Sequence, residues 1–259
     1  MTILVRKLLG LVFPIKCLGC GAYGEYVCGS CLEEVKSLDR QQCPHCRGVS
    51  ELGEFCSGRC RDGLFGYPAY FDGLYVCSEY DRAGVLKKLI TQFKYKFSEE
   101  IVYSLSSKMS EQRAFMNKFC DQGLGNEKIL IVPVPLHYKR QKERGFNQAY
   151  LLAKQMEWLL RPNSKLTNAL VRNKNTKKQS KLSRADRLNN LTGAFSLKQK
   201  QQIDGRQVIL IDDVCTTGST LNECAKVLKK AGAKSVRGFV LARGTAPKKN
   251  SLPIHTFCI

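Results

Sequence analysis

Two adjacent carboxylates follow an apolar run in the segment VILIDDVCTTGST. Asp212 and Asp213 would repel each other and lose hydration unless a ligand binds them, because neighbouring carboxylates disfavour ionisation. The loop behind them offers hydroxyls and backbone N–H groups at the start of a predicted helix, where an anion is favoured. Its residues are Thr216, Thr217, Gly218, Ser219 and Thr220. A ribose 5-phosphate carries both the hydroxyls that the acids accept and the phosphate that the loop binds, so we predict a sugar-phosphate site.

Eight of the 13 cysteines lie within the first 60 residues, as four pairs at metal-ligand spacing. Three pairs are C-x2-C and one is C-x3-C, and such pairs let two sulfurs reach one tetrahedral Zn2+. Pairing in sequence order predicts two structural zinc sites, although a cross-braced arrangement also satisfies the spacing. The sets are Cys17, Cys20, Cys28 and Cys31, and Cys43, Cys46, Cys56 and Cys60. His45 is an alternative ligand, but eight cysteines already complete two sites.

Composition predicts a globular protein with a polyanionic partner. The 259 residues include 42 Lys and Arg against 22 Asp and Glu, a formal net charge of +20. Such an excess favours nucleic acid over a membrane surface, and a solvated basic face is the plainer alternative. No apolar run approaches the ~18 residues of a membrane span. The start of the chain lacks a good signal peptide and predicts a short helix over residues 8–13, so we expect a cytoplasmic protein without membrane insertion.

The elements that position the two acids alternate between strands and helices. Strands are expected over residues 73–80, 128–135, 207–212 and 235–243. Helices are expected over residues 81–97, 98–120, 147–160 and 219–231. Residues 161–191 are polar and cationic and predict a mobile excursion. This alternation is typical of a doubly wound α/β sheet, in which ligands bind at the carboxyl ends of the strands. Cys215 lies at such an end, but no histidine neighbours it in sequence, which argues against a nucleophile.

The 13-residue run from Val208 to Thr220 resembles the phosphoribosyl pyrophosphate (PRPP) signature of type I phosphoribosyltransferases. With VPVPLHYKRQKERGFNQAYLLA, LVRNKNTKKQSKLSRADRLNNLTGAF and the cysteine pairs, nearly the whole chain resembles the ComF family of competence-associated proteins. The resemblance implies a zinc module over residues 1–62. It also implies a phosphoribosyltransferase-like domain over residues 63–259, with a parallel sheet covered by helices on both faces.

The resemblance also assigns roles to residues. It implies that Asp212 and Asp213 bind the ribose hydroxyls and that the loop 216–220 binds the 5-phosphate. The turn beginning at Val134 and the side chain of Arg144 would bind pyrophosphate, with Mg2+ bridging it to the ribose. A flexible catalytic loop would contribute Arg172, Gln179, Arg187 and Asn190. If catalysis occurs, Asp212, Asp213 and Arg187 would carry it.

Two functional classes follow. The first is a PRPP-binding protein of DNA uptake in natural transformation, with single-stranded DNA and a competence helicase or translocase as partners. The second is an active phosphoribosyltransferase that transfers ribose phosphate to an acceptor. Aromatic residues among the cations would stack on bases in the first class. The cations expected to form that DNA surface are Lys87, Lys88, Lys94, Lys96, Lys139, Arg140, Lys142, Arg144 and the run 174–181, and the aromatics are Tyr95, Phe97, Tyr138 and Phe146.

Overall fold

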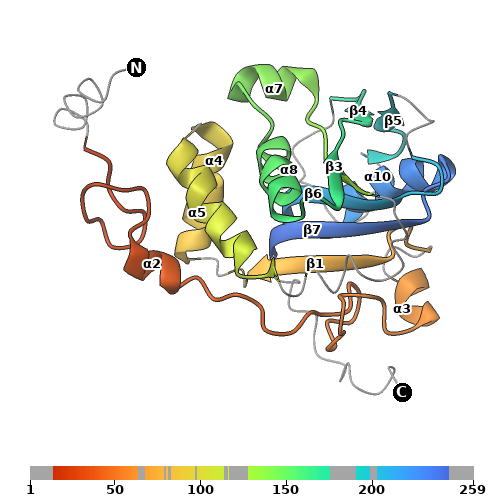
Figure 1. Ribbon diagram of the computed structural model, residues 1–259, viewed down its shortest axis with the longest axis horizontal. Helices are drawn as coiled ribbons and strands as arrows, with labels where there is room; N and C mark the ends of the chain where they lie inside the picture. Colours follow the sequence, from red (N-terminus) through yellow and green to blue (C-terminus); the bar gives the residue numbers. More distant parts are fainter. Residues whose placement is uncertain are drawn as a thin grey trace.

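A five-stranded parallel sheet, in the order β1-β7-β6-β2-β3, forms the centre of the molecule (Figure 1). The computed structural model describes residues 14–63, 68–78, 80, 83–96, 98–113, 116, 128–175, 191–198 and 203–244. The strands are β1 (Gly73–Ser78), β2 (Ile129–Pro133), β3 (Ser164–Leu166), β6 (Gln207–Cys215) and β7 (Ser235–Arg243). Every neighbouring pair runs parallel. The predicted parallel α/β sheet is therefore confirmed.

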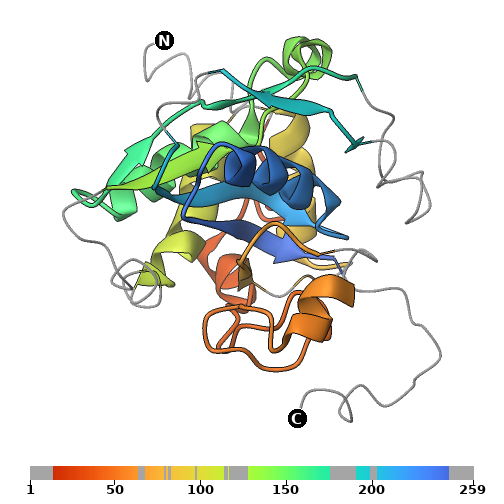
Figure 2. The ribbon, with the colours of Figure 1, turned by 90° about the vertical axis from the view of Figure 1, so that its right-hand side faces the viewer.

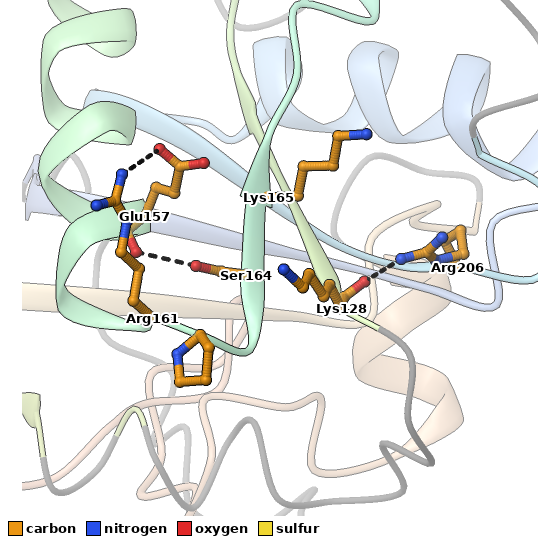
Figure 3. Close-up of a pocket in the computed structure, with 7 residues that line it drawn as sticks. Lys128, Glu157, Arg161, Ser164, Lys165 and Arg206 are labelled. Carbon is orange, nitrogen blue, oxygen red and sulfur yellow. Dashed lines mark hydrogen bonds and ion pairs between the residues drawn. The ribbon is translucent and has the colours of Figure 1, made fainter.

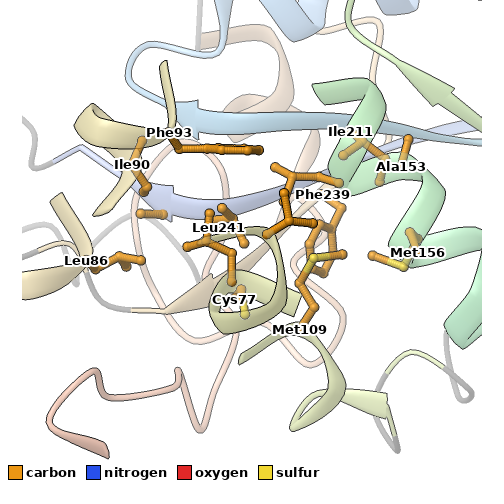
Figure 4. Packing of buried hydrophobic residues seen from close by; sticks show 14 of the residues in the cluster. Cys77, Leu86, Ile90, Phe93, Met109, Ala153, Met156, Ile211, Phe239 and Leu241 are labelled. Atoms are coloured by element: carbon orange, nitrogen blue, oxygen red, sulfur yellow. The ribbon is translucent and has the colours of Figure 1, made fainter. Parts of the chain in front are cut away.

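Helices cover both faces of the sheet because both faces of its strands are apolar. In β6, Ile209 and Ile211 belong to one hydrophobic cluster, and Val208 and Leu210 belong to another. The first cluster includes α4, α5 and α8, and Figure 4 shows part of it. The second cluster includes α10. The bounds are α4 (Val85–Tyr95), α5 (Glu99–Ser110), α8 (Gln148–Leu159) and α10 (Ser219–Lys230).

The cysteine-rich segment runs beneath the sheet, along its β1 edge (Figure 2). It contains two short helices, α2 (Gly29–Glu33) and α3 (Gly58–Gly63). The side chain of Gln41 completes the edge, because its Oε1 accepts from Val76 N at 2.9 Å and its Nε2 donates to Val76 O at 3.1 Å. Cys17 and Cys31 also belong to the hydrophobic cluster that contains α4. The cysteine-rich segment and the sheet therefore share buried surface.

Three segments differ from the sequence predictions. A helix, α7 (Tyr138–Arg144), occupies a stretch that was expected to be a loop, and it ends at Gly145 with φ 80°. The excursion contains β3 and also β4 (Leu170–Arg172), which pairs with β5 (Phe195–Leu197) in an antiparallel ribbon. These strands are short and lack the long apolar runs from which β2, β6 and β7 could be predicted. Helix α5 ends at Ser110, Arg113 and Met116 are again helical, and residues 117–120 of the predicted helix lie outside the described residues. The helix predicted over residues 8–13 lies outside the described residues.

Within the described part of the chain, no helix has both the length and the apolar character needed to cross a membrane.

Candidate functional site

The two acids lie inside the carboxyl-terminal part of β6, which continues past them to Cys215. Successive side chains of a strand point to opposite faces, so Asp212 and Asp213 project to the two sides of the sheet. Asp213 forms an ion pair with Lys94 Nζ of α4 at 2.9 Å. Asp212 Oδ1 accepts from the backbone N–H of Asp213 at 2.9 Å. The two carboxylates thus lie next to each other near the carboxyl end of the strand.

Asp212 holds its proton more tightly than an ordinary carboxyl group. Burial and, after it, the charge of the neighbouring Asp213 raise its pKa to about 7, although the Asp213 N–H, Lys94 and Arg172 act in the opposite direction. Near neutral pH this group is therefore close to half-ionised. A ligand that donates hydroxyl hydrogen bonds or brings a cation would favour its ionised form.

The loop after β6 makes a tight turn into α10. Gly218 adopts φ 84°, a left-handed conformation that glycine accepts without strain, and it precedes the first residue of α10. The hydroxyls of Thr217 and Ser219 lie 2.8 Å apart and bond to each other. Thr216 and Thr220 line the neighbouring cavity, whereas Ser219 is buried. The amino end of a 12-residue helix therefore meets the cavity through hydroxyl-bearing residues, which suits an anion.

A cavity of about 480 Å³ lies at the carboxyl ends of β2 and β6. Its size is within the range of small-molecule sites. Its ionic lining consists of five cations and three carboxylates, namely Lys87, Lys94, Arg140, Arg144, Arg172, Glu143, Asp212 and Asp213. Val134 also lines it, and the Val134 N–H is bonded to Ile211 O at 2.9 Å. An anionic ligand with hydroxyl groups matches this lining.

Neighbouring side chains hold two of the arginines in place. Arg144 Nη1 donates to Gln148 Oε1 at 2.9 Å, and its guanidinium lies over the ring of Tyr95. Arg172 is buried, and its guanidinium lies 5.4 Å from the ring centre of Phe195. Such fixed guanidinium groups are suited to bind pyrophosphate oxygens. Of the other residues assigned to a flexible loop, Gln179, Arg187 and Asn190 lie outside the described residues.

Several cations that were expected on a DNA surface line this cavity. Lys87, Lys94 and Arg140 all line it, and so does Tyr95. The sequence indicated that Lys87 and Lys94 lie on the same side of a helix, because Lys87, Thr91 and Lys94 are spaced i, i+4, i+7. The sequence analysis did not identify Lys94 as the partner of Asp213, since that contact joins residues 119 positions apart.

The eight N-terminal cysteines meet in two groups, as pairing in sequence order predicts. In each group the four sulfurs lie within 4.8 Å of one another, and neither group includes His45. Cys28 Sγ lies 3.7 Å from both Cys17 Sγ and Cys20 Sγ. A tetrahedral Zn2+ with Zn–S bonds of 2.3 Å requires sulfurs about 3.8 Å apart. Both groups therefore fit zinc, and the cysteines among the described residues are free of disulfides.

Thiol pKa values in the first group favour a bound cation. Burial opposes ionisation of Cys17, yet backbone N–H groups, including those of Cys28 and Gly19, lower its pKa to about 6. The neighbouring thiol of Cys28 raises the pKa of Cys31 to about 12. Four thiolates together therefore require a positive ion. Outside the two groups, burial raises the pKa of the Cys215 thiol, which agrees with its exclusion as a nucleophile.

Comparisons with known proteins agree with the site and the cysteine groups. Residues 103–259 match the family described as "Phosphoribosyl transferase domain". Competence protein F of Haemophilus influenzae is 36% identical, over 84% of this chain and 90% of that protein. Competence protein ComFC of Bacillus subtilis is 33% identical, over 85% of each chain. DNA utilization protein YhgH of Escherichia coli O6:H1 is 32% identical, over 87% of this chain and 93% of that protein.

Proposed function

Because the chain belongs to the ComF family of phosphoribosyltransferase-domain proteins, we propose that it binds PRPP and acts in DNA uptake during natural transformation. The observation that carries PRPP binding is the cavity at the carboxyl ends of β2 and β6, where two carboxylates, a hydroxyl-rich helix start and five cations meet. Relatives named for competence and for DNA utilization support the cellular role.

Each part of PRPP has a counterpart in this cavity. Asp212 and Asp213 would accept hydrogen bonds from the ribose hydroxyls, and the loop 216–220 would bind the 5-phosphate. The turn that begins at Val134 and the guanidinium of Arg144 would bind pyrophosphate, with Arg140 and Arg172 adding positive charge. Mg2+ would bind together with PRPP beside the carboxylates Asp212 and Asp213, and it would neutralise part of the pyrophosphate charge, since it prefers oxygen ligands. Arg187 would reach the pyrophosphate from its loop.

Calorimetry with PRPP and Mg2+ tests the binding site. Asp212→Asn and Asp213→Asn should each weaken binding, because the ribose hydroxyls lose a charged acceptor. Gly218→Val should weaken it too, because a β-branched residue is strained at φ 84°. Exposed Asp39→Asn provides a matched control and should bind PRPP like the wild type. Unchanged affinity in all three site variants would exclude this cavity as the PRPP site.

Single-stranded DNA is the second proposed ligand. The net charge of +20 supports it, because a polyanion releases counterions when it meets such a surface. A labelled oligonucleotide should bind at low salt, with an affinity that falls as salt rises and with little dependence on base sequence. A salt-independent affinity, or no binding at low salt, would reject the DNA role. A competence helicase or translocase remains a proposed partner, and a pull-down with tagged protein tests it.

Phosphoribosyl transfer is the alternative function, and the separation of charges in the cavity favours it. As the bond from ribose C1 to pyrophosphate breaks, its electron pair leaves with pyrophosphate, which the cations would stabilise. Asp212 and Asp213 would face the positive charge that develops on the sugar. An acceptor lone pair would then form the new bond to C1. Release of pyrophosphate from PRPP in the presence of candidate acceptors would separate an enzyme from a binding protein.

We also propose that residues 1–62 form the zinc module and that residues 63–259 form the phosphoribosyltransferase-like domain. The two cysteine groups within residues 17–60 support this division. Limited proteolysis tests the boundary, since exposed linkers between domains are cut first. Cleavage that begins within 17–60 in the zinc-loaded protein would contradict it.

A further inference from the structure

A second basic depression, of about 640 Å³, lies at the amino ends of β2, β3 and β6, whereas the PRPP cavity lies at the carboxyl ends of the strands. Figure 3 shows the residues that line the depression. Four cations line it, with Glu157 as the one carboxylate among the lining residues. The cations are Lys128, Arg161, Lys165 and Arg206. Ser164 adds a hydroxyl and Pro162 an apolar surface. We call these residues the amino-edge patch.

The topology of the parallel sheet creates this patch. Lys128 directly precedes β2, Lys165 lies in β3, and Arg206 directly precedes β6. Parallel pairing of Leu130 with both Lys165 and Val208 brings these three strand starts together. The guanidinium of Arg206 donates to Lys128 O, which fixes the two strand starts side by side.

The patch carries more positive than negative charge, with four cations and one carboxylate among its lining residues. Glu157 Oε1 accepts from Leu166 N at 2.9 Å, and its Oε2 lies 3.8 Å from Arg161 Nη2. No described carboxylate forms an ion pair with Lys128 or Lys165. Like charges gathered at one edge repel one another, so the arrangement favours an anionic ligand.

The shape of the patch favours a chain of phosphates over one small anion. Lys234 directly precedes β7, and its N–H donates to Arg206 O at 2.9 Å, so the row of cations continues past the depression. Neighbouring strands lie about 4.8 Å apart, so the starts of β2, β6 and β7 span about 10 Å. Lys128, Lys165 and Lys234 are exposed. An extended polyanion can contact such a row.

An exposed aromatic residue neighbours two residues of the patch in the chain. Trp158 lies in the last turn of α8, next to Glu157, and its backbone oxygen accepts from Arg161 N. Its side chain is 64% exposed, which is unusual for a residue of this size. Exposed aromatic residues beside cations are the stacking platforms of proteins that bind single strands.

We propose that the amino-edge patch and Trp158 bind single-stranded DNA, with the lysines and arginines on its phosphates and Trp158 stacked on a base. The proposal rests on the proposed DNA role and names the surface that performs it. Many of the cations on α4 and α7 line the PRPP cavity, whereas no residue of the amino-edge patch does. Asp212 lies six residues along β6 from Arg206, so the two sites are about 20 Å apart. PRPP and DNA therefore bind at the same time.

Trp158 is the only tryptophan of the chain, so its fluorescence reports this surface alone. Full-length zinc-loaded protein is titrated with a thymidine oligonucleotide at low salt, with and without saturating PRPP. Stacking should quench the tryptophan, with the same affinity that anisotropy of a labelled oligonucleotide gives. PRPP by itself should leave the fluorescence and the DNA affinity unchanged.

Charge reversal at Lys128 and Lys165 provides a second test of the proposal. Lys128→Glu with Lys165→Glu should lower DNA affinity on the order of tenfold or more. It should also flatten the slope of log K against log salt by about 1.4, for two lost phosphate contacts. PRPP affinity should be retained, which shows that the variant is folded. Lys36→Glu with Arg40→Glu makes the same charge change at exposed positions elsewhere and should bind DNA nearly as the wild type does.

The outcomes separate this proposal from the DNA role itself. If anisotropy shows DNA binding without tryptophan quenching, DNA binds on another surface. An equal loss of DNA affinity in the Lys36 and Arg40 variant would mean the same. Either result would overturn this proposal but not the DNA role. A strong loss of DNA affinity in Lys139→Glu with Lys142→Glu, together with unchanged affinity in Lys128→Glu with Lys165→Glu, would show that DNA binds beside the PRPP cavity. Quenching by inorganic phosphate to the same extent would make the patch a small-anion site. No binding by either readout would overturn the DNA role as well.

Discussion

At the scale of residues, Asp212 and Asp213 show how adjacent groups acquire different properties. They point to opposite sides of one strand, so each meets a different helix layer. Asp213 is paired with Lys94 at 2.9 Å, whereas burial keeps the pKa of Asp212 near 7. One carboxylate thus has a lysine partner and the other has a raised pKa, although both belong to one short motif.

The raised pKa of Asp212 predicts a pH-dependent stability. An unfolded aspartate has a pKa near 3.9, so between about pH 4 and 7 the folded protein retains a proton that the unfolded chain has released. The wild type should therefore lose stability as pH rises through this window. Asp212→Asn should not, and it should gain on the order of 2 kcal/mol relative to the wild type between pH 4.5 and 8. Urea unfolding at both pH values measures the difference. A gap that is independent of pH would contradict it.

Gly19 provides a second prediction at this scale. A Cβ atom at this position would lie 2.4 Å from Cys31 Sγ, closer than any real contact. Gly19→Ala should displace that sulfur and accelerate zinc loss to a chelator on the order of tenfold, as for other changes beside metal ligands. Gly29→Ala is the matched control, because a Cβ atom there meets nothing within 4 Å. Equal release from both variants would show that the close approach is unimportant.

At the scale of elements, helix α4 connects the first cysteine group to the PRPP cavity. Its Lys88 Nζ donates to Leu18 O at 2.8 Å, inside the first cysteine pair. Leu86 and Leu89 share a hydrophobic cluster with Cys17 and Val27. Lys94, in the last turn of the same helix, reaches Asp213. The position of this lysine therefore depends on the packing beneath the helix.

Loss of the first zinc site should then weaken PRPP binding. Cys20→Ser removes an exposed ligand of that group and should reduce PRPP affinity several-fold, because α4 loses its support and Lys94 its position. Cys56→Ser alters the second group, which contacts β7 through hydrogen bonds from Arg243 to Cys43 O and Pro44 O. It should have the smaller effect on PRPP, as measured by calorimetry. Equal losses, or none, would contradict coupling through α4.

At the scale of the whole molecule, the parallel sheet separates the two proposed anion sites. Parallel strands place all their carboxyl ends at one edge and all their amino ends at the other. The PRPP cavity lies at the first edge, and the amino-edge patch lies at the second. One sheet can therefore hold a small phosphorylated ligand and a polyanion at once.

The shared core predicts that zinc removal affects the whole molecule. Elemental analysis should give about two zinc per chain. Chelation should lower the unfolding temperature of the sheet by roughly 5 °C or more, because Cys17, Cys31 and the residues around them belong to the cluster that covers it. Calorimetry with and without chelator measures this shift. A sheet that unfolds at the same temperature without zinc would show that the cysteine-rich segment is energetically independent.

Local patterns in the sequence were sufficient to predict the central strands, the main helices and the motif at 208–220. Long apolar runs and helical spacing are set by neighbours in the chain, so they can be read without the fold. Helix α7 was not predicted because its residues are mostly charged, and β3, β4 and β5 were not predicted because each has only three residues and depends on its pairing partner. The roles given to Gln179, Arg187 and Asn190 remain predictions.

The sequence by itself determined the cysteine pairs, the acids, the hydroxyl-rich loop and the excess of positive charge, because each is a matter of residue type and spacing. Tertiary structure decided which cysteines share a group and that Lys94 pairs with Asp213. It also decided that Lys128, Lys165 and Arg206 form one patch. These contacts join residues far apart in the chain, and only the order and register of the strands bring them together.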